Sequence, residues 1–279
     1  MAGAERHSFG FFLAGGGETM VSFQGKRVVV TGGNSGIGKC IAKCFVDAGA
    51  KVLIGSRNVD TLAAAAREIG ALFEAVDVSD WQSTKSFAEA AKAKLGGIDI
   101  GVNSAGVEQM VMLKKHPEDH VSKMTAIQFN GAVHFMQHIS NAMENGGNIV
   151  NISSLTGINS APGYIAYGGA KAGVIHASKV AAVELASRGI RVNVVSPTVV
   201  LTPLVQKMFA VPGFEAALLE EHPLGRLPTP QDVADAVMWL AGDTARCVTG
   251  QNICVDSGAR QTRLPRPADV ARHAKAAST

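Results

Sequence analysis

The segment Thr31-Gly-Gly-Asn-Ser-Gly-Ile-Gly38 constrains the fold of this chain more than any other part of the sequence. It follows a run of β-branched residues, 27–31, and opens a stretch in which Ile37, Ile41 and Phe45 recur at helical spacing. Glycines at a strand-to-helix turn let the backbone approach a diphosphate closely, and the helix N-terminus supplies free amides. The sequence therefore predicts a phosphate-binding loop, formed by Gly32, Asn34, Ser35, Gly36, Ile37 and Gly38.

Short apolar strands alternate with longer helical segments along the rest of the chain, which is typical of βαβ units. Because the strands are almost continuously apolar, we expect helices on both faces of the sheet. The fold class predicted for residues 23–260 is α/β, a single doubly wound Rossmann domain. We expect an N-terminal extension at 1–22 and a basic C-terminal tail at 261–279. Seven parallel strands are expected, at 27–31, 51–55, 72–76, 98–102, 148–152, 191–195 and 252–255.

Charge and composition exclude several classes of protein. The net charge of +3 arises in the tail, where five basic residues follow Gly258, so the body of the domain is close to neutral. With two Trp and two Tyr and no basic stripe, a nucleic-acid binder is not expected. Four cysteines are too few for a disulfide framework and indicate a reducing, cytoplasmic location. No apolar run approaches the roughly 20 residues of a membrane span.

The residues after the second predicted strand bear on the choice of nucleotide. Ser56, Arg57 and Asn58 stand where an acidic residue would bind the free 2′-hydroxyl of NAD(H). An arginine beside a small neutral residue suits the 2′-phosphate of NADP(H) instead. NADP(H) is therefore the preferred cofactor, with NAD(H) as the alternative if Arg57 is only a solvated turn residue or stacks on adenine.

A second group of residues indicates acid–base chemistry. Lys171 lies four residues after Tyr167, so the two side chains share a helical face, whereas Tyr164 has Gly168 at the matching position. Lys171, together with an oxidised nicotinamide ring, is expected to lower the pKa of the Tyr167 phenol. Ser154 lies at the end of a predicted strand, where ligands of parallel sheets bind.

Together these features resemble the short-chain dehydrogenase/reductase family over residues 23–260. The resemblance implies that Asn130 kinks its helix and holds a water of the proton relay, and that Lys171 also binds the nicotinamide ribose. It implies homotetramers formed through the helices at 118–143 and 167–187. It further implies cofactor contacts or support from Asp77, Val78, Asn103, Ala105, Gly106, Pro197, Val200 and Thr202.

Two positions depart from the family pattern, Ser104 and Thr198. Thr198, with Asp80-Trp81 and Pro223-Leu-Gly-Arg226, is similar to the L-xylulose (dicarbonyl) reductase and carbonyl reductase branch. The catalytic set implied is Asn130, Ser154, Tyr167 and Lys171, without a metal.

The function expected is NADPH-dependent reduction of a ketone, dicarbonyl or keto-sugar, with hydride transfer and Tyr167 as the proton donor. Alternatives are an NAD-dependent dehydrogenase of a secondary alcohol, a 3-oxoacyl-carrier-protein reductase, and an NADPH-binding sensor or scaffold without catalysis. The apolar segment 203–222 is interpreted as a mobile lid over a small-molecule substrate, or else as an oligomer contact or packing element.

Overall fold

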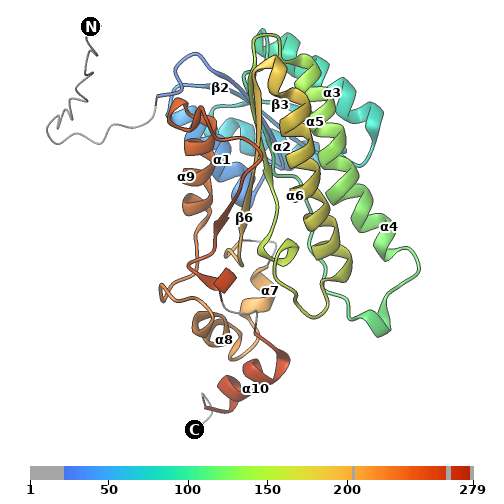
Figure 1. Ribbon diagram of the computed structural model, residues 1–279, viewed down its shortest axis with the longest axis vertical. Coiled ribbons are helices and arrows are strands. Elements are labelled where there is room, and N and C mark those ends of the chain that lie inside the picture. Colours follow the sequence, from blue (N-terminus) through green and yellow to red (C-terminus); the bar gives the residue numbers. More distant parts are fainter. Residues whose placement is uncertain (1–21, 203–204, 262–264, 277–279) are drawn as a thin grey trace, which may run out of the picture.

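The computed structural model describes residues 22–202, 205–261 and 265–276. Within these residues a seven-stranded parallel sheet has the order β3-β2-β1-β4-β5-β6-β7 (Figure 1). The predicted doubly wound α/β fold is thereby confirmed. The strands are β1 (Arg27–Thr31), β2 (Lys51–Ser56), β3 (Leu72–Ala75), β4 (Ile100–Asn103), β5 (Gly147–Ile152), β6 (Ile190–Pro197) and β7 (Asn252–Val255).

Helices cover both faces because successive strand residues point to opposite sides of the sheet. Val28 and Val30 of β1 belong to one buried cluster and Val29 to the other. The first cluster includes residues of α1 (Gly36–Asp47), α2 (Val59–Ile69) and α9 (Pro230–Ala241). The second includes residues of α3 (Trp81–Leu95), α5 (Gly131–Ala142) and α6 (Ile165–Leu185).

The helix expected over residues 118–143 is not continuous. It consists of α4 (His120–Thr125), a π-helical turn over residues 126–130, and α5. A π turn inserts an extra residue into the helical repeat and rotates the side chains that follow, so regular spacing fails here. β4 also begins two residues later than expected, because the Asp99 carboxylate accepts hydrogen bonds from the backbone and guanidinium of Arg27.

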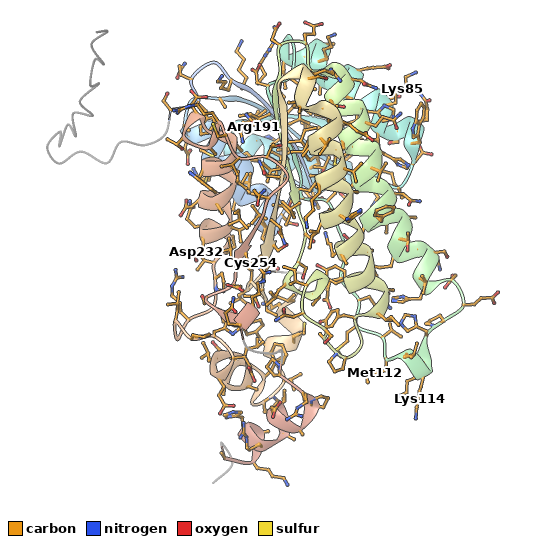
Figure 2. All side chains as sticks on the ribbon, viewed as in Figure 1. Lys85, Met112, Lys114, Arg191, Asp232 and Cys254 are labelled. Atoms are coloured by element: carbon orange, nitrogen blue, oxygen red, sulfur yellow. The ribbon has the colours of Figure 1, made fainter. Side chains whose placement is uncertain are left out.

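The two ends of the sheet differ in what surrounds them. Arg191, at the start of β6, marks the amino end, and Met112 and Lys114 lie near the opposite end (Figure 2). At that carboxyl end lie α7 (Gln206–Phe209), α8 (Phe214–Glu220) and α10 (Pro267–Ala276) (Figure 1). Ligands of open parallel sheets bind at the carboxyl ends of the strands, so this end is where a site is expected.

Helix α10 packs against α8. Glu220 forms an ion pair with Arg272 at 2.7 Å, Nε2 of His273 lies 2.8 Å from the same carboxylate, and the backbone of α10 approaches Gly213 closely. Residues 267–276, grouped with the basic tail on sequence grounds, thus form a helix against the domain. None of the helices in the described part of the chain is long and apolar enough to cross a membrane.

Candidate active site

The glycine loop after β1 forms the predicted turn. Gly32 has a φ of +71°, and a Cβ there would lie 2.7 Å from the Ser104 carbonyl oxygen. A Cβ on Gly38 would lie 2.3 Å from the Gly32 carbonyl oxygen. Both positions therefore require glycine if the loop is to turn tightly and pack against α1.

The N-terminus of α1 is free to bind an anion. Ser35 precedes the helix without a capping hydrogen bond from its side chain, and the first turn contains no acidic residue. The first amides of a helix lack partners within the helix and carry positive partial charge. This donor set fits the diphosphate of a nicotinamide dinucleotide.

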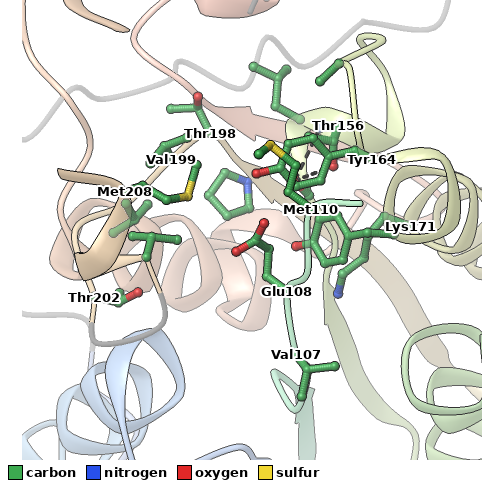
Figure 3. A pocket seen from close by; sticks show the side chains of 18 of the residues that line it. Val107, Glu108, Met110, Thr156, Tyr164, Lys171, Thr198, Val199, Thr202 and Met208 are labelled. Atoms are coloured by element: carbon green, nitrogen blue, oxygen red, sulfur yellow. Dashed lines mark hydrogen bonds between the residues drawn. The ribbon is translucent and has the colours of Figure 1, made fainter. Parts of the chain in front are cut away.

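A cavity of about 560 Å³ extends from this loop to α6 and to the segment containing α7 and α8 (Figure 3). The predicted site residues that line it are Gly32, Asn34, Ser35, Gly36, Ile37, Gly38, Gly106, Ser154, Tyr167, Lys171, Pro197, Val200 and Thr202. The phosphate loop and the proposed acid–base residues thus share one cavity.

Ser154, Tyr167 and Lys171 meet where β5 ends and α6 begins. Ser154 follows β5, and its Oγ accepts hydrogen bonds from the backbone amide of Thr156 at 3.2 Å and from its hydroxyl at 2.9 Å. Tyr167 hydrogen-bonds with Ser154. The Lys171 ammonium, one turn further along α6, donates to the Ile152 carbonyl at 2.8 Å. The order and mutual position of the three side chains are those expected for acid–base chemistry at an oxygen of the substrate.

Burial dominates the protonation of this group. It lowers the pKa of Lys171 to about 8, because a buried ammonium loses its hydration. It also raises the pKa of Tyr167 to about 12, against the hydrogen bond with Ser154, which favours the phenolate. The sequence predicted a lowered pKa for Tyr167. That expectation includes an oxidised nicotinamide ring beside the phenol, so the value of about 12 applies to Tyr167 without the cofactor, and the lowered pKa stays a prediction for the complex.

Glu108 was not identified from the sequence and lies in this cavity. It follows β4 in an irregular segment, and Figure 3 shows it between the α6 side, with Tyr164 and Lys171, and the opposite wall, with Val199 and Met208. Burial, and then the charge of Glu108, raise the pKa of Tyr164. An acidic residue shortly after the carboxyl end of a strand was the available sequence signal.

Asn103 belongs to a buried hydrogen-bond chain that joins the central strands to α6. The Thr31 hydroxyl donates to Asn103 at 3.0 Å, and Asn103 donates to Asn151 at 3.2 Å. Asn151 in turn donates to Ser178 of α6 at 3.0 Å. Thr31 also accepts a bond from the backbone amide of Ala105 at 3.3 Å. Asn103 thus joins β1, β5 and α6, its support of a cofactor stays a prediction, and the sequence does not indicate Asn151 or Ser178.

Asn130 lies away from the cavity, contrary to its expected place in a proton relay. Its side chain is exposed at the end of the π turn, whereas Gln128, two residues earlier, is 2% exposed and lines the cavity. Residues two apart on a helix point to nearly opposite sides, which explains why Gln128 faces the cavity when Asn130 faces away from it. The Gln128 amide donates to the Val107 carbonyl, and its Oε1 has no partner among the described residues.

The residues predicted to meet the adenosine part lie at or just after the ends of β2 and β3, and none of them lines the cavity. Arg57 is exposed and forms no ion pair with any described residue, and the buried Ser56 hydroxyl is also without a partner. Asn58 caps α2 through the Thr61 amide at 3.0 Å. The Asp77 carboxylate accepts from the Ser79 hydroxyl at 2.6 Å. The side chain of Val78 is buried.

The end of β6 explains one departure from the family pattern. Thr198 is buried, and its hydroxyl contacts Nε2 of His222 at 3.2 Å, while Nδ1 of that ring contacts the Leu218 carbonyl at 2.5 Å. Thr198 therefore attaches α8 to the sheet. Of the expected lid, Pro203 and Leu204 lie outside the described residues, and Val205, Met208, Val211, Phe214 and Leu218 line the cavity.

No group of three or more potential metal ligands occurs in the described ranges. The rings of His116 and His120 pack edge to face, with centroids 4.8 Å apart.

Comparison with known proteins agrees with this geometry. Residues 32–260 match the family model described as Enoyl-(Acyl carrier protein) reductase. The chain is 36% identical to the 3-oxoacyl-(acyl-carrier-protein) reductase FabG of Thermotoga maritima, over 84% of this chain and 98% of that protein. It is 36% identical to a D-threitol dehydrogenase of Mycolicibacterium smegmatis, over 84% of this chain and 92% of that protein.

A solved structure resembles the whole domain. The short-chain type dehydrogenase/reductase from Mycobacterium ulcerans superimposes with a TM-score of 0.85 at 33% identity, covering 88% of this chain and 93% of that one. Enzymes of this kind use NAD(P)(H), and the loop described above fits such a dinucleotide. On fold, site and sequence, the chain is an oxidoreductase of the short-chain dehydrogenase/reductase family.

Proposed function

We propose that the protein is an NADPH-dependent reductase of ketones, dicarbonyls or keto-sugars. The observation that carries this proposal is the meeting of Ser154, Tyr167 and Lys171 in the cavity that also contains the glycine loop. The cavity wall carries both the hydroxyl groups of Ser154 and Tyr167 and the amides of the glycine loop. This arrangement suits a dinucleotide and a small carbonyl compound bound side by side.

The bound nicotinamide would supply the hydride that reduces the carbonyl carbon. In this mechanism the Ser154 and Tyr167 hydroxyls hold the carbonyl oxygen. Tyr167 is protonated at neutral pH, since its pKa is about 12, and it gives its proton to that oxygen. The Lys171 ammonium, held at Ile152, then stabilises the phenolate that remains.

The preference for NADPH rests on Arg57 and Ser56. An exposed arginine without an ion pair among the described residues is free to bind a 2′-phosphate, and the Ser56 hydroxyl lacks a partner beside it. No acidic side chain occupies this position to bind the free 2′-hydroxyl of NAD(H). NADH would accordingly bind without the charge-assisted contacts.

Reduction of a 3-oxoacyl group on an acyl carrier protein is the second candidate, because the similar Thermotoga maritima protein has that activity in its name. An acidic carrier requires basic side chains that are free to dock it. Arg188, a basic residue just after the C-terminal end of α6, is not free, because it donates to the Ser140 and Met143 carbonyls at 2.7 and 3.0 Å. We therefore place this candidate after the small-molecule reductase.

The test is oxidation of NADPH with small diketones, xylulose, aromatic aldehydes, a keto-steroid and an acetoacetyl-carrier protein, with NADH in parallel. We expect turnover of a free ketone with NADPH and slower turnover with NADH. Turnover of the carrier-bound substrate alone would favour the second candidate. Oxidation of a secondary alcohol with NAD alone would favour the dehydrogenase alternative, and tight NADPH binding without turnover would favour a sensor.

We further propose a homotetramer in the cytoplasm. The helices expected at the interfaces expose apolar side chains, among them Val133 of α5 and Val183 of α6, the latter 79% exposed. Exposed apolar side chains on these helices are available to pack against a second copy of the chain. Cys40, Cys44, Cys247 and Cys254 are free thiols, as suits a reducing compartment. Light scattering after size-exclusion chromatography measures the assembly directly.

A further inference from the structure

Glu108 is the one acidic residue among the described residues that line the cavity. The rest of the wall is largely apolar around it, including Met110, Met208, Phe214 and Val270. The carboxylate lies in the middle of this space, next to the α6 side that carries the acid–base residues (Figure 3). The fold thus places a hydrogen-bond acceptor beside the reacting groups.

One oxygen of this carboxylate is without a partner. Oε1 of Glu108 is buried and has no direct hydrogen-bond partner among the described residues, and the Tyr164 hydroxyl is the protein donor that interacts with this carboxylate. A buried acceptor that lacks a donor is unfavourable, more so when it is charged. A molecule in the cavity that brings a donor to this oxygen removes that cost.

The segment that carries Glu108 is anchored at the preceding residue. The side-chain amide of Gln128, in the π turn, donates to the carbonyl of Val107. Gly106 allows this approach, because a Cβ at that position would lie 2.9 Å from Oε1 of Gln128. Glu108 is therefore positioned before a substrate arrives, which reduces the ordering cost of binding.

The carboxylate lies near both tyrosine hydroxyls of the cavity. Its charge acts on Tyr164 and on Tyr167 and raises the pKa of each. When the Tyr167 hydroxyl binds the carbonyl oxygen of a substrate, the carbon next to that carbonyl therefore lies near the Glu108 carboxylate.

We propose that Glu108 determines specificity by accepting a hydrogen bond from a hydroxyl group on the carbon next to the reacting carbon. This inference rests on the proposed reductase function and names its substrate class: an α-hydroxy ketone with an apolar remainder, or the corresponding vicinal diol in the reverse direction. A dicarbonyl presents only acceptors to the carboxylate and is disfavoured, and an α-keto acid is repelled by charge.

Three ketones of nearly equal size test the proposal: 2-hydroxypropiophenone, isobutyrophenone and 1-phenyl-1,2-propanedione. They place a hydroxyl, a methyl and a carbonyl group at the same position. A hydrogen bond to a charged group is worth about 10- to 100-fold. We expect kcat/KM of the wild type to favour the hydroxy ketone over the methyl ketone by at least about 10-fold, with the dione below the hydroxy ketone.

Two variants separate charge from shape. In Glu108→Gln the preference for the hydroxy ketone should fall at least about 5-fold, because a neutral acceptor forms a weaker bond. The Glu108→Leu variant should no longer prefer the hydroxy ketone over the methyl ketone. Glu118→Gln, an exposed carboxylate in the same connection between β4 and α4, is the matched control and should retain the preference. Unchanged preference in both Glu108 variants, or a wild type that prefers the dione, overturns the proposal.

A binding measurement keeps the test independent of turnover. With NADPH bound, an alcohol cannot be oxidised, so calorimetry measures recognition alone. We expect 1-phenyl-1,2-propanediol to bind at least about 10-fold more tightly than 2-methyl-1-phenyl-1-propanol, and Glu108→Leu to abolish the difference. Such binding without reduction of any ketone would refute the reductase function and support the role of Glu108. Equal binding of both alcohols to the wild type would refute the role of Glu108.

Discussion

Lys171 should make the folded protein gain stability at alkaline pH, relative to a Lys171→Met variant. The lysine is 6% exposed, and burial lowers its pKa to about 8, from 10.5 in the absence of burial. Between these two pH values the unfolded chain binds a proton that the folded chain does not. Stability therefore rises with pH in this window, and the cost of burying the ammonium is fully present below pH 8.

The size of the effect follows from the shift. Each pKa unit corresponds to about 1.4 kcal/mol, and Lys171 is already half deprotonated at pH 8, so from pH 8 to pH 10 the wild type should gain about 2 kcal/mol relative to the variant. The Ile152 carbonyl, which accepts from the ammonium, loses its donor in Lys171→Met. That loss costs about 1–3 kcal/mol at every pH. The diagnostic quantity is therefore how the difference in the free energy of unfolding between the wild type and Lys171→Met changes with pH. The size of that difference at a single pH is not diagnostic.

Urea unfolding followed by circular dichroism at pH 7, 8, 9 and 10 measures this quantity, at one protein concentration and without cofactor. Lys179→Met, which removes an exposed lysine of the same helix, is the control and should run parallel to the wild type. If Lys171→Met also runs parallel, the ammonium is hydrated in the folded state, and the account of its burial is wrong.

Three further predictions concern the cofactor and the reaction. Gly38→Ala should abolish NADPH binding measured by fluorescence, because its Cβ would lie 2.3 Å from the Gly32 carbonyl oxygen. Arg57→Ala should weaken NADPH binding at least about 10-fold and NADH binding less than about 3-fold, because only the 2′-phosphate loses an ion pair; equal losses would remove Arg57 from the site. The rate of ketone reduction should fall as pH rises through about 8, as Lys171 loses its charge. A rate that does not change up to pH 10 would contradict the role of the Lys171 charge in the reaction.

The parts of the fold that sequence predicts well are local. The glycine loop, the seven strands and the Tyr167–Lys171 pair each lie in short segments whose spacing matches one regular element. Ser154 follows from its position at a strand end. In these cases the residue pattern and the tertiary structure favour the same arrangement.

The parts that were missed depend on irregular or distant structure. The π turn changes the helical phase, so regular spacing cannot tell that Gln128 rather than Asn130 faces the cavity. Glu108 lies in a segment without periodicity. Helix α10 is rich in charge and short, and its partner Glu220 is about fifty residues earlier, so composition alone indicates only a basic tail. The raised pKa of Tyr167 depends on burial, which no motif encodes.

The most direct test of the account is NADPH oxidation with the panel of carbonyl compounds by the wild type, Tyr167→Phe and Tyr164→Phe. Tyr167→Phe should lose at least about 100-fold in turnover while its affinity for NADPH is largely kept. Tyr164→Phe should lose far less, because Tyr164 has Gly168 where Tyr167 has Lys171. Wild-type turnover in Tyr167→Phe would contradict the assignment of the proton donor, and with it the central claim.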